Sequence, residues 1–106
     1  MVIKELVKKI FSKIVNAIYE DDLLDYAVEE NIALVDLVEE YYPKIIKLAR
    51  KIAKNKPHLL DSLTFEKTMD YLRRKHPEVY LRIKEKGYED WVRDQIILFK
   101  KRILYD

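Results

Sequence analysis

Residues 34–55 have the sequence LVDLVEEYYPKIIKLARKIAKN, and this stretch decides the fold. Apolar side chains recur in it at intervals of four, three, four, three and four residues: Leu34, Val38, Tyr41, Ile45, Leu48 and Ile52. This spacing places them on one face of an α-helix. The pattern continues through Pro43, whose ring lacks an N–H and clashes with the preceding helical turn. The stretch therefore predicts two closely stacked helices, or one kinked helix, with the junction at Pro43.

The residues before this stretch show the same helical period. Amphipathic helices are expected over residues 2–19 and 22–42, and Asp21 or Asp22 is suited to cap the second. Asn31 would lie in the middle of the apolar face of a continuous helix over 22–42. Because a buried amide without partners is costly, we expect a break or short turn near Asn31.

The residues after the stretch predict three further helices. They are expected over residues 65–75, 78–86 and 89–104, after a connection at 57–63. Ser62 or Thr64 can cap the first of them, and Gly87 suits the left-handed position that ends the second. No segment alternates as a half-buried strand does. The sequence thus predicts one all-α domain over residues 1–106, a compact bundle of five to seven helices with no β-sheet.

Composition excludes several classes of protein. The 106 residues are 49% hydrophobic and 38% charged, with one Gly and no Cys. This length and apolar content suffice for a core without disulfides. The lack of Cys removes thiol catalysis and Cys-type zinc sites, and one Gly cannot build a glycine-rich phosphate loop. No apolar run approaches the ~18 residues of a membrane span.

The expected setting is cytoplasmic, without a membrane partner. The first residues, MVIKE, lack the order of regions found in a signal peptide. Lys and Glu are abundant, whereas Asn and Gln number three and one. Since thermophilic proteins favour ion pairs and avoid labile amides, we expect a thermophile, either an archaeon or an archaeal virus, as the source.

Charge is segregated along the chain. Residues 14–43 hold nine acidic side chains and no Lys or Arg, whereas residues 44–106 hold 17 Lys or Arg and nine acidic side chains. Acidic and basic helices can pack side by side and neutralise each other, or the fold can keep a negative and a positive face apart and so steer partners. The sequence leaves both interpretations open.

The basic residues form the clearest functional pattern. A row with three-, four- and three-residue spacing lies along one side of the helix predicted after Pro43, where it can follow a phosphate backbone. Two further clusters occur later in the chain. The candidate nucleic-acid-binding residues are Lys44, Lys47, Arg50, Lys51, Lys54, Arg73, Arg74, Lys75, Lys100, Lys101 and Arg102. The plain alternative is that these cations only keep the surface soluble.

A helix-turn-helix is a further possibility for residues 65–105. The short helix at 78–86 would then enter the major groove. Glu78 and Glu85 would be two acids in that reading helix, which fits phosphate poorly.

The acidic residues form a candidate partner-binding surface. If residues 22–42 make one helix, six acids share its polar face: Asp22, Asp25, Glu29, Asp36, Glu39 and Glu40. Carboxylates at such spacing can also hold Mg²⁺, as in small all-α nucleotide pyrophosphatases. The paired Glu-Glu-x-x-Glu and Glu-x-x-Asp motifs of those enzymes are missing, and the acids lie opposite the apolar stripe. A surface that faces solvent or a protein partner is the favoured interpretation.

The aromatic residues divide into core and surface candidates. The core candidates lie on apolar stripes: Phe11, Tyr41, Phe65, Trp91 and Phe99. The candidates for exposure are Tyr19, Tyr42, Tyr80, Tyr88 and Tyr105. The two histidines, His58 and His76, have no ligand or acid partner at a useful spacing, so no catalytic residue, metal site or cofactor is expected.

These patterns together predict a non-catalytic accessory module of a nucleic-acid-handling complex. Its basic helix faces would contact phosphates, and its acidic face would contact a protein partner. Two alternatives stay open. One is a homo-oligomeric structural or interaction protein that binds no nucleic acid. The other is a small Mg²⁺-dependent enzyme that resembles nucleotide pyrophosphatases.

Overall fold

The computed structural model describes residues 9, 12, 13, 16 and 23–105. Its elements from Leu23 onward are α2 (Leu23–Glu29), α3 (Leu34–Tyr41), α4 (Pro43–Asn55), the 3₁₀-helix η2 (Pro57–Ser62), α5 (Phe65–Lys75), α6 (Pro77–Lys86) and α7 (Glu89–Tyr105). No strand occurs in this described part of the chain, and the predicted all-α bundle is confirmed. Most of the helix predicted over 2–19, and the cap at Asp21 or Asp22, lie outside the described residues.

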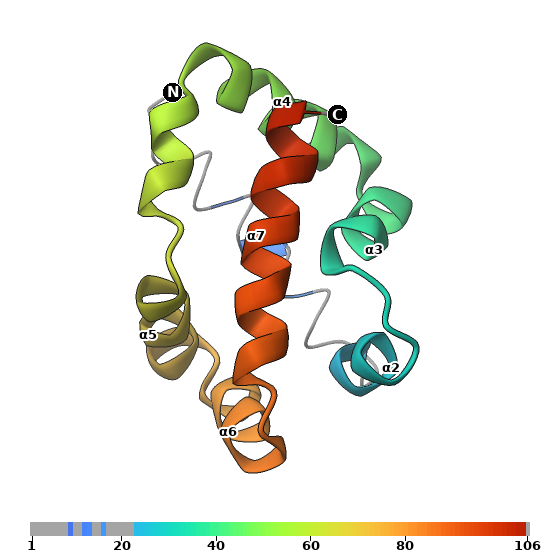
Figure 1. Cartoon of the computed structure of the whole chain (residues 1–106), viewed down its shortest axis with the longest axis vertical. Coiled ribbons are helices and arrows are strands. Elements are labelled where there is room, and N and C mark those ends of the chain that lie inside the picture. The colour runs from blue at the N-terminus through green and yellow to red at the C-terminus, as the bar shows by residue number, and fades with distance from the viewer. Residues whose placement is uncertain (1–8, 10–11, 14–15, 17–22, 106) are drawn as a thin grey trace.

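Helix α7 is the central element of the bundle. It follows the long axis of the molecule, with α5 on one side and α3 on the other (Figure 1), and it contacts α3, α4 and α5. The largest fully buried side chains come from six helices: Leu24, Val35, Val38, Ile46, Leu72, Ile83 and Ile103. They form one continuous apolar core, so each helix is held by the face that it turns inward.

The acidic segment is broken where Asn31 lies. Asn31 has a positive φ of 53°, a left-handed conformation that asparagine tolerates better than most residues. The backbone N–H of Ile32 donates to the carbonyl of Ala27 at 2.9 Å and closes the turn after α2. The predicted break is confirmed, so residues 22–42 do not form one helix and their acids do not share one face.

Two helices meet at Pro43. Tyr42 leaves the helical conformation, with φ −136°, and its backbone N–H donates to the carbonyl of Val38 at 2.6 Å. Pro43 then begins α4, where a missing N–H costs nothing. Of the two arrangements that the spacing allowed, the stacked pair is correct: α3 and α4 are separate helices in contact.

Helix α3 receives its N-terminal cap from α7. Ala33 precedes α3 and supplies no side-chain cap. Instead, the backbone N–H of Leu34 donates to Oε1 of Gln95 at 2.5 Å. The bond joins residues 61 positions apart, and local sequence patterns gave no sign of it.

The caps expected around α5 and α6 are present. Thr64 Oγ1 accepts a hydrogen bond from the backbone N–H of Lys67 at 3.2 Å, so Thr64 rather than Ser62 caps α5. Gly87 ends α6 in the left-handed region, with φ 70° and ψ 37°. Helix α6 begins at Pro77, one residue before the predicted start.

The aromatic residues depart from the sequence expectation. Tyr41 was predicted to be core, but it is 57% exposed, because α3 ends there and the ring lies outside the junction with α4. The other described core candidates, Phe65, Trp91 and Phe99, are half-buried against the core. Three residues expected at the surface are also half-buried against it: Tyr42, Tyr80 and Tyr88. Phe11, Tyr19 and the side chain of Tyr105 lie outside the described residues.

Candidate nucleic-acid interface

The outer face of α4 carries a row of exposed lysines. Its inner face is buried through Ile46, Ala49 and Ala53, which fixes the helix against the core. The opposite face presents four exposed side chains: Lys44, Lys47, Lys51 and Lys54. Each step of three or four residues advances about 5 Å along the axis, so the row is about 15 Å long. None of the four ammonium groups forms an ion pair with a residue in the described part of the chain.

Arg50 lies beside this row but is bound to α3. Its guanidinium Nη2 is 3.3 Å from Oε1 of Glu39, and its side chain is only 23% exposed. Sequence spacing had placed Arg50 with the phosphate-contacting residues. The structure instead places it in the contact between α3 and α4, where it neutralises an acid.

The basic cluster at the end of α7 also contains both a cation that pairs with α3 and a cation that is exposed. Arg102 lies 2.8 Å from Asp36 and 3.6 Å from Glu39, and it ties α7 to α3. Lys100 is half-buried, and Lys101 is exposed. Of the three predicted contacts in this cluster, Lys101 presents the most open side chain.

The basic cluster on α5 is exposed, and both of its arginines bind the same carboxylate. Asp70 accepts a hydrogen bond from Arg73 at 2.6 Å and pairs with Arg74 at 3.1 Å. The bond from Arg73 lowers the pKa of Asp70 and in turn raises the pKa of Arg73. Lys75 completes the cluster and is exposed. The α5 cluster therefore retains positive charge, although Asp70 offsets part of it.

Three of the candidate acidic residues pair with cations of neighbouring helices. Asp36 and Glu39 of α3 are held by Arg102 and Arg50. Asp25 of α2 accepts a hydrogen bond from Lys86 at the end of α6, at 2.7 Å. Three members of the predicted partner surface are thus engaged within the chain. Glu29, Asp36 and Glu40 are exposed, and Asp22 lies outside the described residues.

The ion pair between Asp25 and Lys86 shifts both groups. The hydrogen bond from Lys86 lowers the pKa of the Asp25 carboxyl from its ordinary value of 3.8. The same bond raises the pKa of Lys86 from its ordinary value of 10.5. Both groups are therefore charged across the neutral range, and the pair joins α2 to α6.

Helix α6, the candidate reading helix of a helix-turn-helix, packs one face against the core. Val79 and Ile83 are buried, and Tyr80 is half-buried against the core. Lys84 lies 3.7 Å from Glu89 at the start of α7. The exposed face of α6 includes both of the acids noted in its sequence, so α6 is a weaker candidate for phosphate contact than α4.

Other kinds of site find little support in the described residues. No three His, Cys, Asp or Glu side chains among them gather closely enough to hold a metal ion. The ring of His76 packs at 5.8 Å from that of Tyr71. No helix among these residues is long and apolar enough to cross a membrane.

Comparison of the chain with protein-family models, curated protein sequences and solved structures found no significant match. The functional interpretation therefore depends on the residues themselves.

Proposed function

We propose that this chain is a non-catalytic binding module that contacts the phosphate backbone of nucleic acid through the lysine row of α4. The observation that carries the proposal is the exposure of four lysines that lack an acidic partner among the described residues: Lys44, Lys47, Lys51 and Lys54. These four side chains lie on one face of a helix. A rigid row of cations at this pitch suits contacts that release counterions from a polyanion.

Ion pairs within the chain already engage several of the other candidate cations. Arg50 and Arg102 each neutralise α3 acids, and Arg73 and Arg74 share Asp70. The α4 lysines are thereby distinguished from most other candidate cations. Lys75 and Lys101 are exposed and can add contacts at the edges of a larger footprint.

The proposed contact is to phosphate rather than to bases. Lysine is a flexible point charge, whereas base recognition commonly uses the fork of arginine or the amide of asparagine and glutamine. The α4 row contains only lysines. We therefore expect weak sequence preference and strong dependence on salt.

Fewer acidic residues remain for a protein partner than the sequence predicted. Asp25, Asp36 and Glu39 are engaged by basic residues of the same chain, so Glu29 and Glu40 are the exposed acids of this set that no described cation engages. The same pairs weaken the alternative in which copies of the chain assemble through acidic and basic faces.

Charge reversal on α4 tests the proposal. Labelled single-stranded and duplex DNA and RNA would be titrated with the protein, and binding would be followed by fluorescence anisotropy at low salt. The triple variant K47E/K51E/K54E should lose binding. The triple variant K47R/K51R/K54R keeps the charge and should bind comparably to the wild type. Undiminished binding by the Glu triple would overturn the proposal.

A matched pair of single variants separates the position of a charge from the net charge. Lys51→Glu and Lys84→Glu change the net charge equally, and both residues are exposed. Lys51 belongs to the α4 row, and Lys84 lies on α6. Lys51→Glu should weaken binding several-fold more than Lys84→Glu. Equal losses would indicate a diffuse attraction to the whole protein instead of a site.

A further inference from the structure

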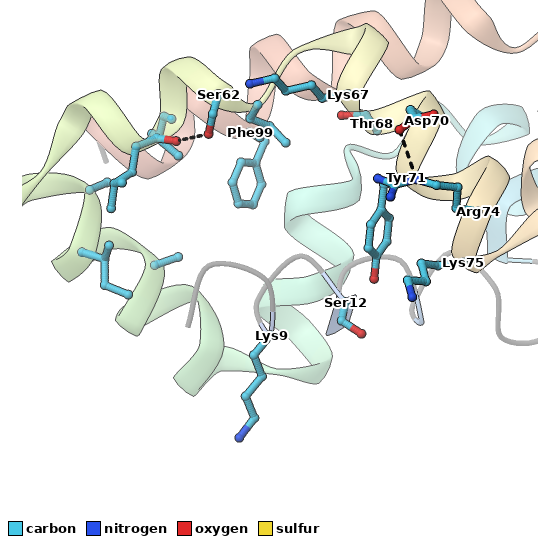
Figure 2. A pocket seen from close by; sticks show the side chains of 16 residues that line it. Lys9, Ser12, Ser62, Lys67, Thr68, Asp70, Tyr71, Arg74, Lys75 and Phe99 are labelled. Atoms are coloured by element: carbon cyan, nitrogen blue, oxygen red, sulfur yellow. Dashed lines mark hydrogen bonds and ion pairs between the residues drawn. The ribbon is translucent and has the colours of Figure 1, made fainter. Parts of the chain in front are cut away.

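A cavity of about 930 Å³ opens between α4, η2, α5 and α7. Its volume is in the range of pockets that hold small organic ligands. Figure 2 shows the rings of Phe99 and Tyr71 projecting from α7 and α5 into this space. The cavity is separate from the lysine row, because the α4 residues that line it are Ala49, Ile52 and Ala53.

The wall of the cavity is mainly apolar and incompletely covered. Helix η2 and the residue after it supply Leu59, Leu60 and Leu63. These leucines are half-buried, as are Ile52 and Phe99 on the facing helices. Helix η2 contributes no fully buried residue, and of its two leucines Leu60 packs against the core. Apolar area left open in this way gains most from a ligand that is itself apolar.

Among the described residues, the charged side chains that line the cavity are mainly cationic. Lys67, Arg74 and Lys75 come from one side of α5, and Lys9 also lines the space. The one carboxylate among the described lining residues is Asp70, which Arg73 and Arg74 already engage. An apolar chamber with this lining favours an anionic head group joined to an apolar body.

We propose that this cavity binds a single-chain anionic amphiphile, of which a long-chain fatty carboxylate is the simplest member. The alkyl chain would lie against Ile52, Leu60 and Phe99. The head group would pair with one of the two exposed α5 lysines that line the cavity, Lys67 or Lys75, which lie about 12 Å apart along the helix. This binding site goes beyond the nucleic-acid proposal and does not depend on it.

Chain length and head-group charge test the proposal directly. The full chain would be titrated calorimetrically with octanoate, decanoate and dodecanoate below their micelle concentrations. Affinity should rise by about fourfold per buried methylene. Dodecanol should bind at least tenfold more weakly than dodecanoate, and dodecyltrimethylammonium more weakly still. Equal affinity for the three head groups, or no binding of dodecanoate, would overturn the proposal.

Variants place the ligand in the cavity. Lys67 and Lys75 are exposed, so K67E/K75E should fold, as circular dichroism would check. This variant should lose at least tenfold in affinity for dodecanoate and little for dodecanol. The control Lys84→Glu, on α6, should bind dodecanoate as the wild type does. An unchanged affinity of K67E/K75E for dodecanoate would contradict the assigned head-group position.

Methyl resonances give a second, independent measure of the site. Dodecanoate should shift the methyl signals of Ile52, Leu59 and Leu60, which line the cavity. The methyls of Val79 and Ile83, buried on α6 and absent from the lining, should shift little. Shifts concentrated on α6 would contradict the proposal, whatever the affinity.

Discussion

The Nη1 atom of Arg102 lies 2.8 Å from Oδ1 of Asp36, so the end of α7 is bound to the start of α3. The contact joins the acidic stretch of the sequence to the basic one. With the pair between Arg50 and Glu39, it shows that acidic and basic helices neutralise each other at the contacts of α3. The α4 lysines do not take part in these pairs, which leaves a positive surface beside a neutralised one.

The pair between Arg102 and Asp36 should make a small, salt-dependent contribution to stability. Both side chains are more than a third exposed, so solvent screens their attraction. A double-mutant cycle with Arg102→Ala and Asp36→Ala should give a coupling energy of about 0.5 kcal/mol. Urea unfolding at low and high salt measures it, and the coupling should shrink at high salt. A coupling that is absent at low salt would contradict the predicted contribution of this pair to stability.

The cap that Gln95 provides to α3 should stabilise the protein more. Gln95→Ala leaves the N–H of Leu34 without its acceptor and should lower the free energy of unfolding by about 1–2 kcal/mol. Gln95→Glu keeps an acceptor and places a negative charge at a helix N-terminus, so it should retain most of the stability. Chemical unfolding compares them. Equal midpoints for Gln95→Ala and the wild type would refute this role.

The lowered pKa of Asp25 predicts how the stability of the protein depends on pH. The pKa of this carboxyl in the folded chain is below the ordinary 3.8, so the pair with Lys86 stabilises the fold above that pH and is lost as pH falls through the lowered pKa. The raised pKa of Lys86 preserves the pair until the pH exceeds 10.5. The stability difference between the wild type and Asp25→Asn should therefore be constant between about pH 5 and 10 and shrink in stronger acid.

The control for this pH dependence lies on the same helix. Glu29→Gln removes an exposed carboxylate of α2 and should change stability less than Asp25→Asn at neutral pH. Unfolding curves recorded from pH 2.5 to 10 for both variants test the assignment. A larger effect from Glu29→Gln would contradict the importance of the α2–α6 pair.

Replacing Gly87 should destabilise the protein because of its backbone conformation. Gly87 has φ 70°, and no neighbouring atom lies within 4 Å of the position that a Cβ would occupy. Gly87→Ala should therefore destabilise through conformation alone, by about 1–2 kcal/mol. Asn adopts left-handed backbone more readily, so Gly87→Asn should cost less. Thermal unfolding ranks the three proteins, and an Ala variant as stable as the wild type would contradict the left-handed cap.

Helix boundaries were predictable because local chemistry sets them. Pro43 and Pro77 begin helices, Thr64 caps one, and Gly87 and Asn31 take left-handed backbone. Each of these effects depends on a residue and its immediate neighbours, so the sequence carries the signal.

Features that depend on distant residues could not be predicted in this way. Gln95 caps a helix 61 residues earlier, and no local pattern marks it. The exposure of Tyr41 follows from how α3 ends against α4. Spacing also could not separate Arg50 from Lys51, although the first binds Glu39 and the second is exposed, because that difference depends on where α3 packs.

The central claim is phosphate contact by the α4 row, and the salt dependence of binding tests it most directly. Duplex DNA would be titrated from low to moderate salt with the wild type and with K47Q/K51Q. Each cation that contacts phosphate adds about 0.9 to the steepness of log K against log salt. The account predicts a wild-type slope of about −3.6 or steeper and a loss of about 2 in the double variant. Equal slopes for the two proteins, or no binding at low salt, would contradict it.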